Sequence, residues 1–117
     1  MNGWIGVDLD GTLSKEVPEG LDKIGEPIPR MVALVRKLLE EGEDVHIFTA
    51  RVAPPIDHKD RLVQEELIRA WCWNHLCTTL PITATKNLSM VRFYDDRAVQ
   101  VETNTGRLIG EEGEDNS

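Results

Sequence analysis

The chain has 117 residues, of which 40% are hydrophobic, and a formal net charge of −8 at neutral pH. This length is typical of one domain with one hydrophobic core, and the apolar content is too low for a membrane-embedded protein. The negative charge argues against broad electrostatic binding of nucleic acid.

The chain starts with a short apolar run, 4–7, which stops at two acids, Asp8 and Asp10. An apolar run of this length, ended by a turn, predicts a buried strand, and Gly11 permits the turn because it has no Cβ. The strand would present both carboxylates in one loop. Carboxylates this close repel each other unless a cation or a shared proton intervenes, and oxygen-only ligands suit Mg²⁺.

A calcium-binding EF-hand loop is the first alternative for this stretch. Counted from Asp8, the twelfth residue is Glu19, as that loop requires. The loop also requires glycine at its sixth position, where this chain has Leu13, and Gly11 stands at the fourth. Because the preceding segment is also strand-like, the pattern does not favour an EF-hand.

Two helices are expected in the first two thirds of the chain. Residues 14–26 are polar with interspersed proline and glycine, which predicts a loop lying over the site. A helix over 29–41 follows, because apolar residues recur there at helical spacing and Gly42 suits the position after its last turn. The second helix begins near Asp57 or Asp60 and runs to about residue 76. Its expected buried stripe is Leu62, Val63, Leu67, Trp71 and Leu76.

Three further strands are expected, and each is followed by one or more polar residues. The strand 45–48 precedes Thr49, Ala50 and Arg51, and the short strand 80–84 precedes Lys86. The strand 91–94 precedes an adjacent acidic pair, Asp95 and Asp96. A hairpin over 99–109 then completes the single domain, 1–110, and an acidic, disordered tail is expected over 111–117.

Strands that alternate with helices predict an α/β fold with a mainly parallel sheet and right-handed crossovers. In such sheets the site lies beyond the carboxyl ends of the strands. All four polar clusters come at strand ends on that side, which is the strongest signal in the sequence. They are Asp8 and Asp10, Thr49, Lys86, and Asp95 and Asp96.

This ordered set of motifs resembles the haloacid dehalogenase family of phosphohydrolases. Its first motif is matched by Asp8 to Leu13, and the threonine, the lysine and the acidic pair follow in the family's order. The resemblance implies a three-layer, Rossmann-like fold and a Mg²⁺-dependent phosphomonoesterase. The segments where family members carry cap domains are short here, which implies a capless enzyme.

The resemblance also implies a role for each matching residue. Asp8 would be the nucleophile that forms an aspartyl-phosphate, and Asp10 the general acid and base. Thr49, Ala50, Arg51 and Lys86 would bind substrate, with Thr49 and Lys86 also serving catalysis. The Mg²⁺ ligands would be Asp8, Asp10 (through its backbone carbonyl), Asp95 and Asp96 (directly or through water).

Several substrates and functions stay open at this stage. Thr49-Ala50-Arg51 and Asp95-Asp96-Arg97 resemble the 3′-phosphatase domain of phage-type polynucleotide kinases, so the partner is a phosphorylated small molecule or a nucleic-acid 3′ end. A non-catalytic scaffold of the same fold is another option. A phosphoacceptor receiver domain is disfavoured, because there the acidic pair comes first. No basic segment precedes the N-terminal apolar run, so we expect a cytoplasmic protein without a signal peptide, and oligomerisation is possible.

Overall fold

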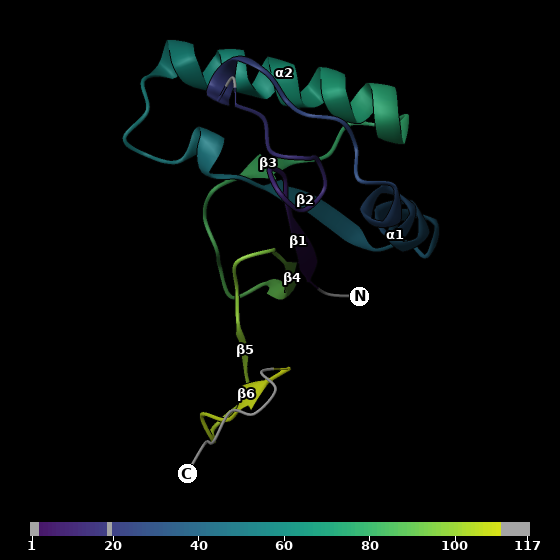
Figure 1. The fold of residues 1–117 in the computed structure, drawn as a ribbon, viewed down its shortest axis with the longest axis vertical. Helices are drawn as coiled ribbons and strands as arrows, with labels where there is room; N and C mark the ends of the chain where they lie inside the picture. Colours follow the sequence, from purple (N-terminus) through teal and green to yellow (C-terminus); the bar gives the residue numbers. More distant parts are fainter. Residues whose placement is uncertain (1–2, 19, 111–117) are drawn as a thin grey trace.

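The computed structural model describes residues 3–18 and 20–110. Its centre is a sheet of four parallel strands in the order β3-β2-β1-β4 (Figure 1). The strands are β1 (Trp4–Asp8), β2 (Asp44–Phe48), β3 (Ile82–Thr83) and β4 (Met90–Tyr94). The mixed α/β class and the mainly parallel sheet expected from the sequence are therefore confirmed.

Two α-helices connect the first three strands: α1 (Pro29–Glu40) and α2 (His58–Leu76). Pro29 stands in the first turn of α1, and Gly42, at a φ of 81°, follows its end, where a left-handed residue stops a helix. Asp57 caps α2, because its side chain accepts a 2.8 Å hydrogen bond from the amide of Asp60. Two short 3₁₀ helices, η1 (Gly20–Asp22) and η2 (Ala50–Val52), lie in the loops.

Both α-helices pack on one face of the sheet, and Arg36 of α1 donates a 2.7 Å hydrogen bond to the carbonyl of His75 in α2. Two right-handed crossovers that advance in the same direction across a sheet place their helices on the same face. Burial of each large apolar side chain stabilises the fold by about 1.5–3 kcal/mol. The core includes Ile5, Val7, Val45 and Ile47 from the strands, Val32, Val35 and Leu38 from α1, and Ile68, Trp71, Cys72 and Leu76 from α2.

On the opposite face of the sheet, aromatic and histidine rings pack against one another, and the loop 84–89 contacts one of them. Trp4 stacks on His46 with ring centroids 4.5 Å apart, and Phe48 meets Phe93 at 4.8 Å. Asn87, in the loop, accepts a 3.0 Å hydrogen bond from the Trp4 indole. The crossover from β3 to β4 is made by a loop without a helix, so in the described residues α-helices cover one face of the sheet, where a three-layer fold has them on both.

The expected buried stripe of α2 is partly wrong. Trp71 and Leu76 are buried, but Leu62 and Val63 are 48% and 51% exposed and Leu67 is half-buried. The first buried residue of α2 is instead Gln64. The N-terminal turns of α2 face the buried Arg51 side chain, which requires a polar partner at that position.

The loop between β1 and α1 is held against the body of the protein. Within the loop, the Lys15 amide donates a 2.8 Å hydrogen bond to the carbonyl of Glu26, and the Trp71 indole of α2 donates a 2.9 Å hydrogen bond to the carbonyl of Gly25. In its described residues this loop contains one short 3₁₀ helix, η1.

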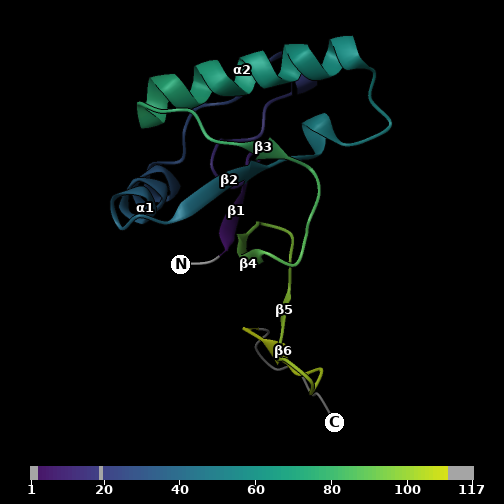
Figure 2. The same cartoon turned by 180° about the vertical axis from the view of Figure 1, so that it is seen from behind.

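A small antiparallel hairpin, β5 (Gln100–Val101) with β6 (Leu108–Ile109), extends away from the sheet on the side opposite α2 (Figures 1 and 2). It confirms the hairpin expected over 99–109. The tail 111–117 and Glu19 lie outside the described residues. Within the described part of the chain, neither helix has the length and apolarity needed to span a membrane.

Candidate metal and phosphate site

Three carboxylates meet at the carboxyl edge of the sheet. Asp8 is the last residue of β1, and Asp95 and Asp96 directly follow β4, its neighbour in the sheet. One oxygen from each carboxylate lies within 4.8 Å of the others. On an octahedral Mg²⁺ with bonds of about 2.1 Å, opposite ligand oxygens are about 4.2 Å apart, so these donors fit the ion with a small adjustment.

The pKa of Asp8 is shifted by burial and by its carboxylate neighbours. Its pKa is raised from 3.8 to about 7, first by burial, then by the hydrogen bond with Asp96 and the repulsion from Asp95. A hydrogen bond from Thr12 acts in the opposite direction. Such a site disfavours the negative charge of Asp8 until a cation joins it.

Thr12 and Gly11 bring Asp8 and Asp96 together. The Thr12 hydroxyl lies 3.2 Å from an oxygen of Asp8 and 3.1 Å from an oxygen of Asp96. Gly11 has a φ of 90°, and a Cβ at this position would lie 2.8 Å from an oxygen of Asp96. A glycine is therefore needed both for the turn and for the approach of Asp96.

The side chain of Asp10 lies apart from the three carboxylates and pairs with Arg51. Nε and Nη2 of Arg51 each donate a 2.8 Å hydrogen bond to one oxygen of Asp10. The side chain of Arg51 is 3% exposed and that of Asp10 is 32% exposed. The remaining Arg51 N–H groups bond Gln64 and the backbone carbonyls of Gly20, Leu21 and Lys23. In this geometry Arg51 has no free N–H for the substrate phosphate that the sequence led us to expect.

Thr49 and Lys86 have different surroundings. Thr49 is 1% exposed, and its side-chain oxygen caps η2 by accepting a 3.1 Å hydrogen bond from the amide of Arg51. Ala50 is exposed at the start of η2. Lys86 is exposed in the loop 84–89 and forms no ion pair with any residue of the described part. Its contact with the carboxylates stays a prediction.

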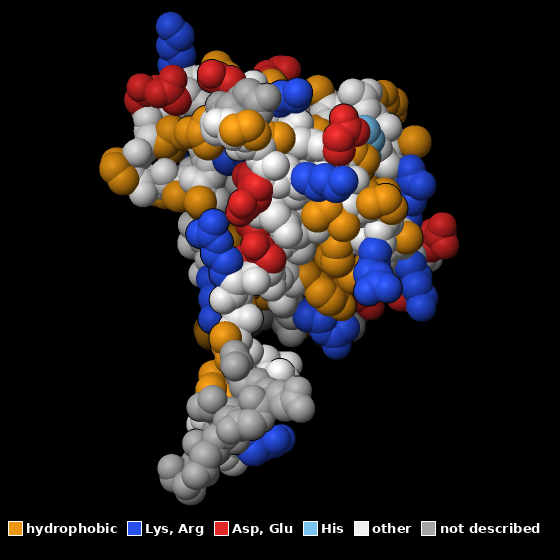
Figure 3. Space-filling view, viewed as in Figure 1, with side chains coloured by type: hydrophobic (Ala, Val, Ile, Leu, Met, Phe, Trp, Pro, Cys, Tyr) orange, Lys and Arg blue, Asp and Glu red, His pale blue; other side chains and the backbone are white. Residues whose placement is uncertain are grey.

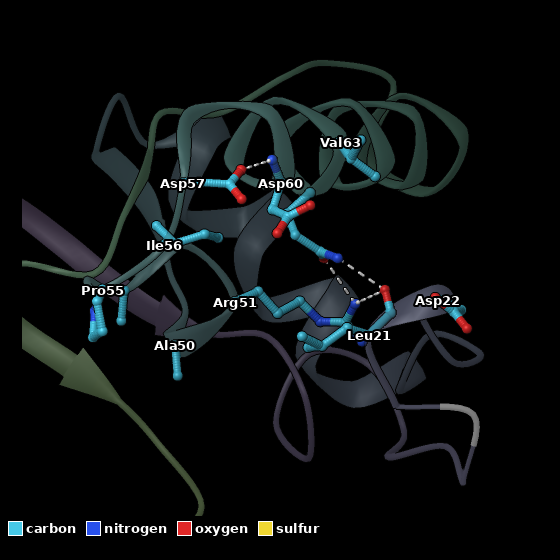
Figure 4. A pocket seen from close by; sticks show the side chains of 11 residues that line it. Leu21, Asp22, Ala50, Arg51, Pro55, Ile56, Asp57, Asp60 and Val63 are labelled. Carbon is cyan, nitrogen blue, oxygen red and sulfur yellow. Dashed lines mark hydrogen bonds between the residues drawn. The ribbon is translucent and has the colours of Figure 1, made fainter.

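Two hollows adjoin this region. One, of about 670 Å³, lies between η1, η2 and the start of α2 (Figure 4). Its lining includes Arg51, Asp22, Asp57 and Asp60 but none of the three clustered carboxylates. The other, of about 220 Å³, is lined by Asp10, Arg51, Glu16, Val17, Gly20 and Leu21. Of the two, the smaller one reaches a carboxylate expected to take part in catalysis.

Sequence reasoning gave no role to two residues of this region, Gln64 and Thr12. Gln64 stands four residues before Ile68 and seven before Trp71, so it shares their buried stripe, and a polar residue on such a stripe signals a buried partner. Thr12 lies inside the first motif, between Gly11 and Leu13. The EF-hand alternative is wrong, because the segment before Asp8 is a strand.

Comparison with known proteins establishes the fold without naming a function. No protein-family model matches the chain. No curated protein matches it either. A solved structure of a conserved protein coded by a locus of Bacteroides thetaiotaomicron is similar, with a TM-score of 0.58 and 22% sequence identity over 85% of this chain and 79% of that chain.

Proposed function

We propose that this protein is a Mg²⁺-dependent phosphomonoesterase of the haloacid dehalogenase type, which acts through an aspartyl-phosphate on Asp8. The observation that supports this most is the meeting of Asp8, Asp95 and Asp96 at one edge of the sheet, with ligand oxygens within 4.8 Å. Their oxygen-only donor set suits Mg²⁺, and their mutual repulsion calls for a cation.

Asp8, Asp95 and Asp96 would hold the ion, together with the backbone carbonyl of Asp10. When bound, Mg²⁺ would neutralise the carboxylates and act as a Lewis acid toward the phosphoryl oxygens. The raised pKa of Asp8 means that, without a cation, its ionised form is disfavoured. A bound cation would favour the ionised carboxylate that a nucleophile needs.

In the first proposed step, a carboxylate oxygen of Asp8 attacks phosphorus, and the bond from phosphorus to the ester oxygen breaks. Asp10, which enters this step protonated, gives its proton to the departing oxygen, which leaves as an alcohol. In the second step, water attacks the phosphorus of the aspartyl-phosphate while Asp10 takes a proton from that water. Inorganic phosphate leaves, and Asp8 is restored.

Thr49 and Lys86 are the proposed ligands of the phosphoryl oxygens. The Thr49 oxygen accepts a hydrogen bond from the amide of Arg51, which leaves its hydroxyl hydrogen free to be donated. Lys86 would supply positive charge as charge builds on the transferred group. Its long, flexible stem lets the amine move toward the site from the exposed loop.

For the substrate we propose a small phosphomonoester rather than a nucleic-acid 3′ end. Arg51, the residue expected to hold a polynucleotide phosphate, has its N–H groups used within the protein. Arg97 pairs with Glu16, which lines the hollow beside Asp10. On the face seen in Figure 3, acidic and basic side chains are interspersed and form no continuous basic surface.

The test is release of phosphate from p-nitrophenyl phosphate under multiple turnover. We expect wild type to require Mg²⁺ and to stop with EDTA, and Asp8→Asn to be inactive. The matched control is Asp44→Asn, which changes an exposed carboxylate at the first residue of β2. Its activity should equal that of wild type. Near-normal turnover by Asp8→Asn would refute the covalent mechanism, and a single turnover would indicate a receiver-like module.

A substrate panel tests the second part of the proposal. It compares sugar phosphates, nucleoside monophosphates and 3′-phosphorylated oligonucleotides at equal Mg²⁺. We expect the highest kcat/KM among the small esters. A preference for the oligonucleotides would replace our assignment with a polynucleotide 3′-phosphatase.

A further inference from the structure

The guanidinium of Arg51 uses all of its hydrogen-bonding capacity inside the protein. It has five N–H groups, and its acceptors are both oxygens of Asp10, the side-chain oxygen of Gln64 and the carbonyls of Gly20, Leu21 and Lys23. The distances run from 2.7 Å to Lys23 to 3.3 Å to Gly20. A ligand that bound Arg51 would have to displace one of these partners.

Gln64 is fixed at both ends of its amide. Its Oε1 accepts a 3.1 Å hydrogen bond from Arg51, and its Nε2 donates a 2.9 Å hydrogen bond to the carbonyl of Leu21. Gln64 is 6% exposed. Only this orientation of the amide satisfies both partners, because Arg51 offers only donors and the carbonyl only accepts. Gln64 thus joins α2 to Arg51 and to η1.

We propose that Arg51 and Gln64 are positioning residues, which hold the Asp10 carboxylate in place for proton transfer and do not contact the substrate phosphate. This inference rests on the proposed function, because it assigns Asp10 the general acid and base of that reaction. Figure 4 shows the Arg51 side chain extending from η2 toward Leu21, below the start of α2.

The two-point contact with Arg51 fixes the plane of the Asp10 carboxylate. Each oxygen accepts one hydrogen bond and keeps a second lone pair, and the 32% exposed side chain lines the smaller hollow. Proton transfer needs a heavy-atom distance of about 2.6–3.2 Å. A carboxylate held in place therefore transfers a proton faster than a mobile one. Lysine would keep the charge at position 51 but lose the fork.

A buried ion pair contributes little to stability once the desolvation of both charges is counted. The fork of Arg51 is therefore better explained by orientation than by stability. The Arg61–Glu65 pair of α2 offers a contrast. The Arg61 side chain is 43% exposed, and neither residue lines the hollow beside Asp10.

The experiment measures kcat and KM with p-nitrophenyl phosphate for Arg51→Lys, Gln64→Met and the control Arg61→Lys. A loss of about 100-fold in kcat is expected for Arg51→Lys, with KM within about twofold of wild type. Gln64→Met should lose about tenfold in kcat, as outer-shell partners do, and Arg61→Lys should match wild type. Thermal melting confirms folding, and Gln64→Met carries the test if Arg51→Lys does not fold.

A rise in KM at unchanged kcat in Arg51→Lys would overturn the inference, because it would make Arg51 a substrate ligand. Unchanged kcat in both variants would also overturn it. Binding of orthovanadate with Mg²⁺, measured by calorimetry, should change less than about twofold in Arg51→Lys, since positioning residues do not touch the phosphate.

If wild type hydrolyses no ester, the proposed function fails, and a crystal structure of Gln64→Met then tests the positioning separately. Loss of a single, ordered Asp10 side chain in that structure would support it. An Asp10 side chain that keeps its place without Gln64 would contradict it.

Discussion

Asp8 and Asp10 are separated by one residue, yet their carboxylates have opposite surroundings. Asp8 lies beside Asp95 and Asp96, and its burial, together with these two neighbours, raises its pKa to about 7. Asp10 lies on the fork of Arg51, which holds its two oxygens with 2.8 Å hydrogen bonds. Arg51 thus supplies positive charge to Asp10, whereas Asp8, Asp95 and Asp96 have no such partner among one another. In the function we propose, Mg²⁺ would supply the positive charge to these three carboxylates.

Removal of one acid from the group Asp8, Asp95 and Asp96 is expected to have the largest effect on activity. Asp95→Asn is expected to lower kcat/KM about a thousandfold, because the Lewis acid is worth several kcal/mol of transition-state stabilisation. Phosphate release at a Mg²⁺ concentration that saturates the wild type measures this loss. The control is Asp60→Asn, which changes an exposed acid at the start of α2. Activity within a few-fold of wild type in Asp95→Asn would remove Asp95 from the site.

A change at Gly11 tests whether the close approach of Asp96 matters. Gly11→Ala adds a Cβ about 2.8 Å from an Asp96 oxygen at a φ of 90°. The strained backbone should cost about 1–2 kcal/mol, and displacement of Asp96 should lower activity about tenfold.

Gly42→Ala is the matched control for Gly11. Its φ is 81°, but a Cβ there meets no atom within 4 Å. It should show a similar loss in melting temperature with unchanged activity. Equal activity losses in both variants would mean that backbone strain, and not Asp96, explains the effect.

The hydroxyl of Thr12 is expected to matter through the orientation of two acids. Thr12→Val removes the donor that lies 3.2 Å from Asp8 and 3.1 Å from Asp96. Mg²⁺ affinity should fall about tenfold, and Thr12→Ser, which keeps the hydroxyl, should retain it. Calorimetric titration with Mg²⁺ measures both, and equal affinities in the two variants would exclude this role.

The smallest expected effect concerns the stability of the metal-free protein. Because the pKa of Asp8 is about 7 when folded and 3.8 as a free side chain, the folded state holds its proton to higher pH. Stability should therefore fall as pH rises from about 4 to about 7 and stay lower above that range. Asp8→Asn removes the penalty, and after allowance for solvent screening it should melt about 4 °C higher than wild type at pH 8 in EDTA.

At pH 4 the same substitution should bring no gain, because Asp8 is then protonated in both states. Saturating Mg²⁺ at pH 8 should also abolish the advantage of Asp8→Asn, since the ion stabilises only the wild-type carboxylate. Melting curves that do not depend on pH in wild type would contradict the raised pKa.

The sequence carried enough information to predict most of the fold and the acidic centre of the site. Asp8, Asp95 and Asp96 follow apolar runs, and parallel neighbouring strands end at the same edge, so their convergence follows from the topology. The helix limits followed from Asp57 and Gly42, whose cap geometry is local.

The fork between Asp10 and Arg51 was not predictable, because it joins residues 41 positions apart through side-chain directions that no local pattern encodes. Hydrophobic periodicity also misplaced Leu62 and Val63, since it records apolarity and not the polar partner that Arg51 requires from α2. The place of Gln64 on a buried stripe was the available signal.

Calorimetric titration of the metal-free protein with Mg²⁺ at pH 7.5 shows which of the two carboxylate regions binds the ion. We predict one ion bound per wild-type chain, no binding to Asp95→Asn, and unchanged binding to Arg51→Lys. An absence of binding to wild type, or equal binding by Asp95→Asn, would contradict the account.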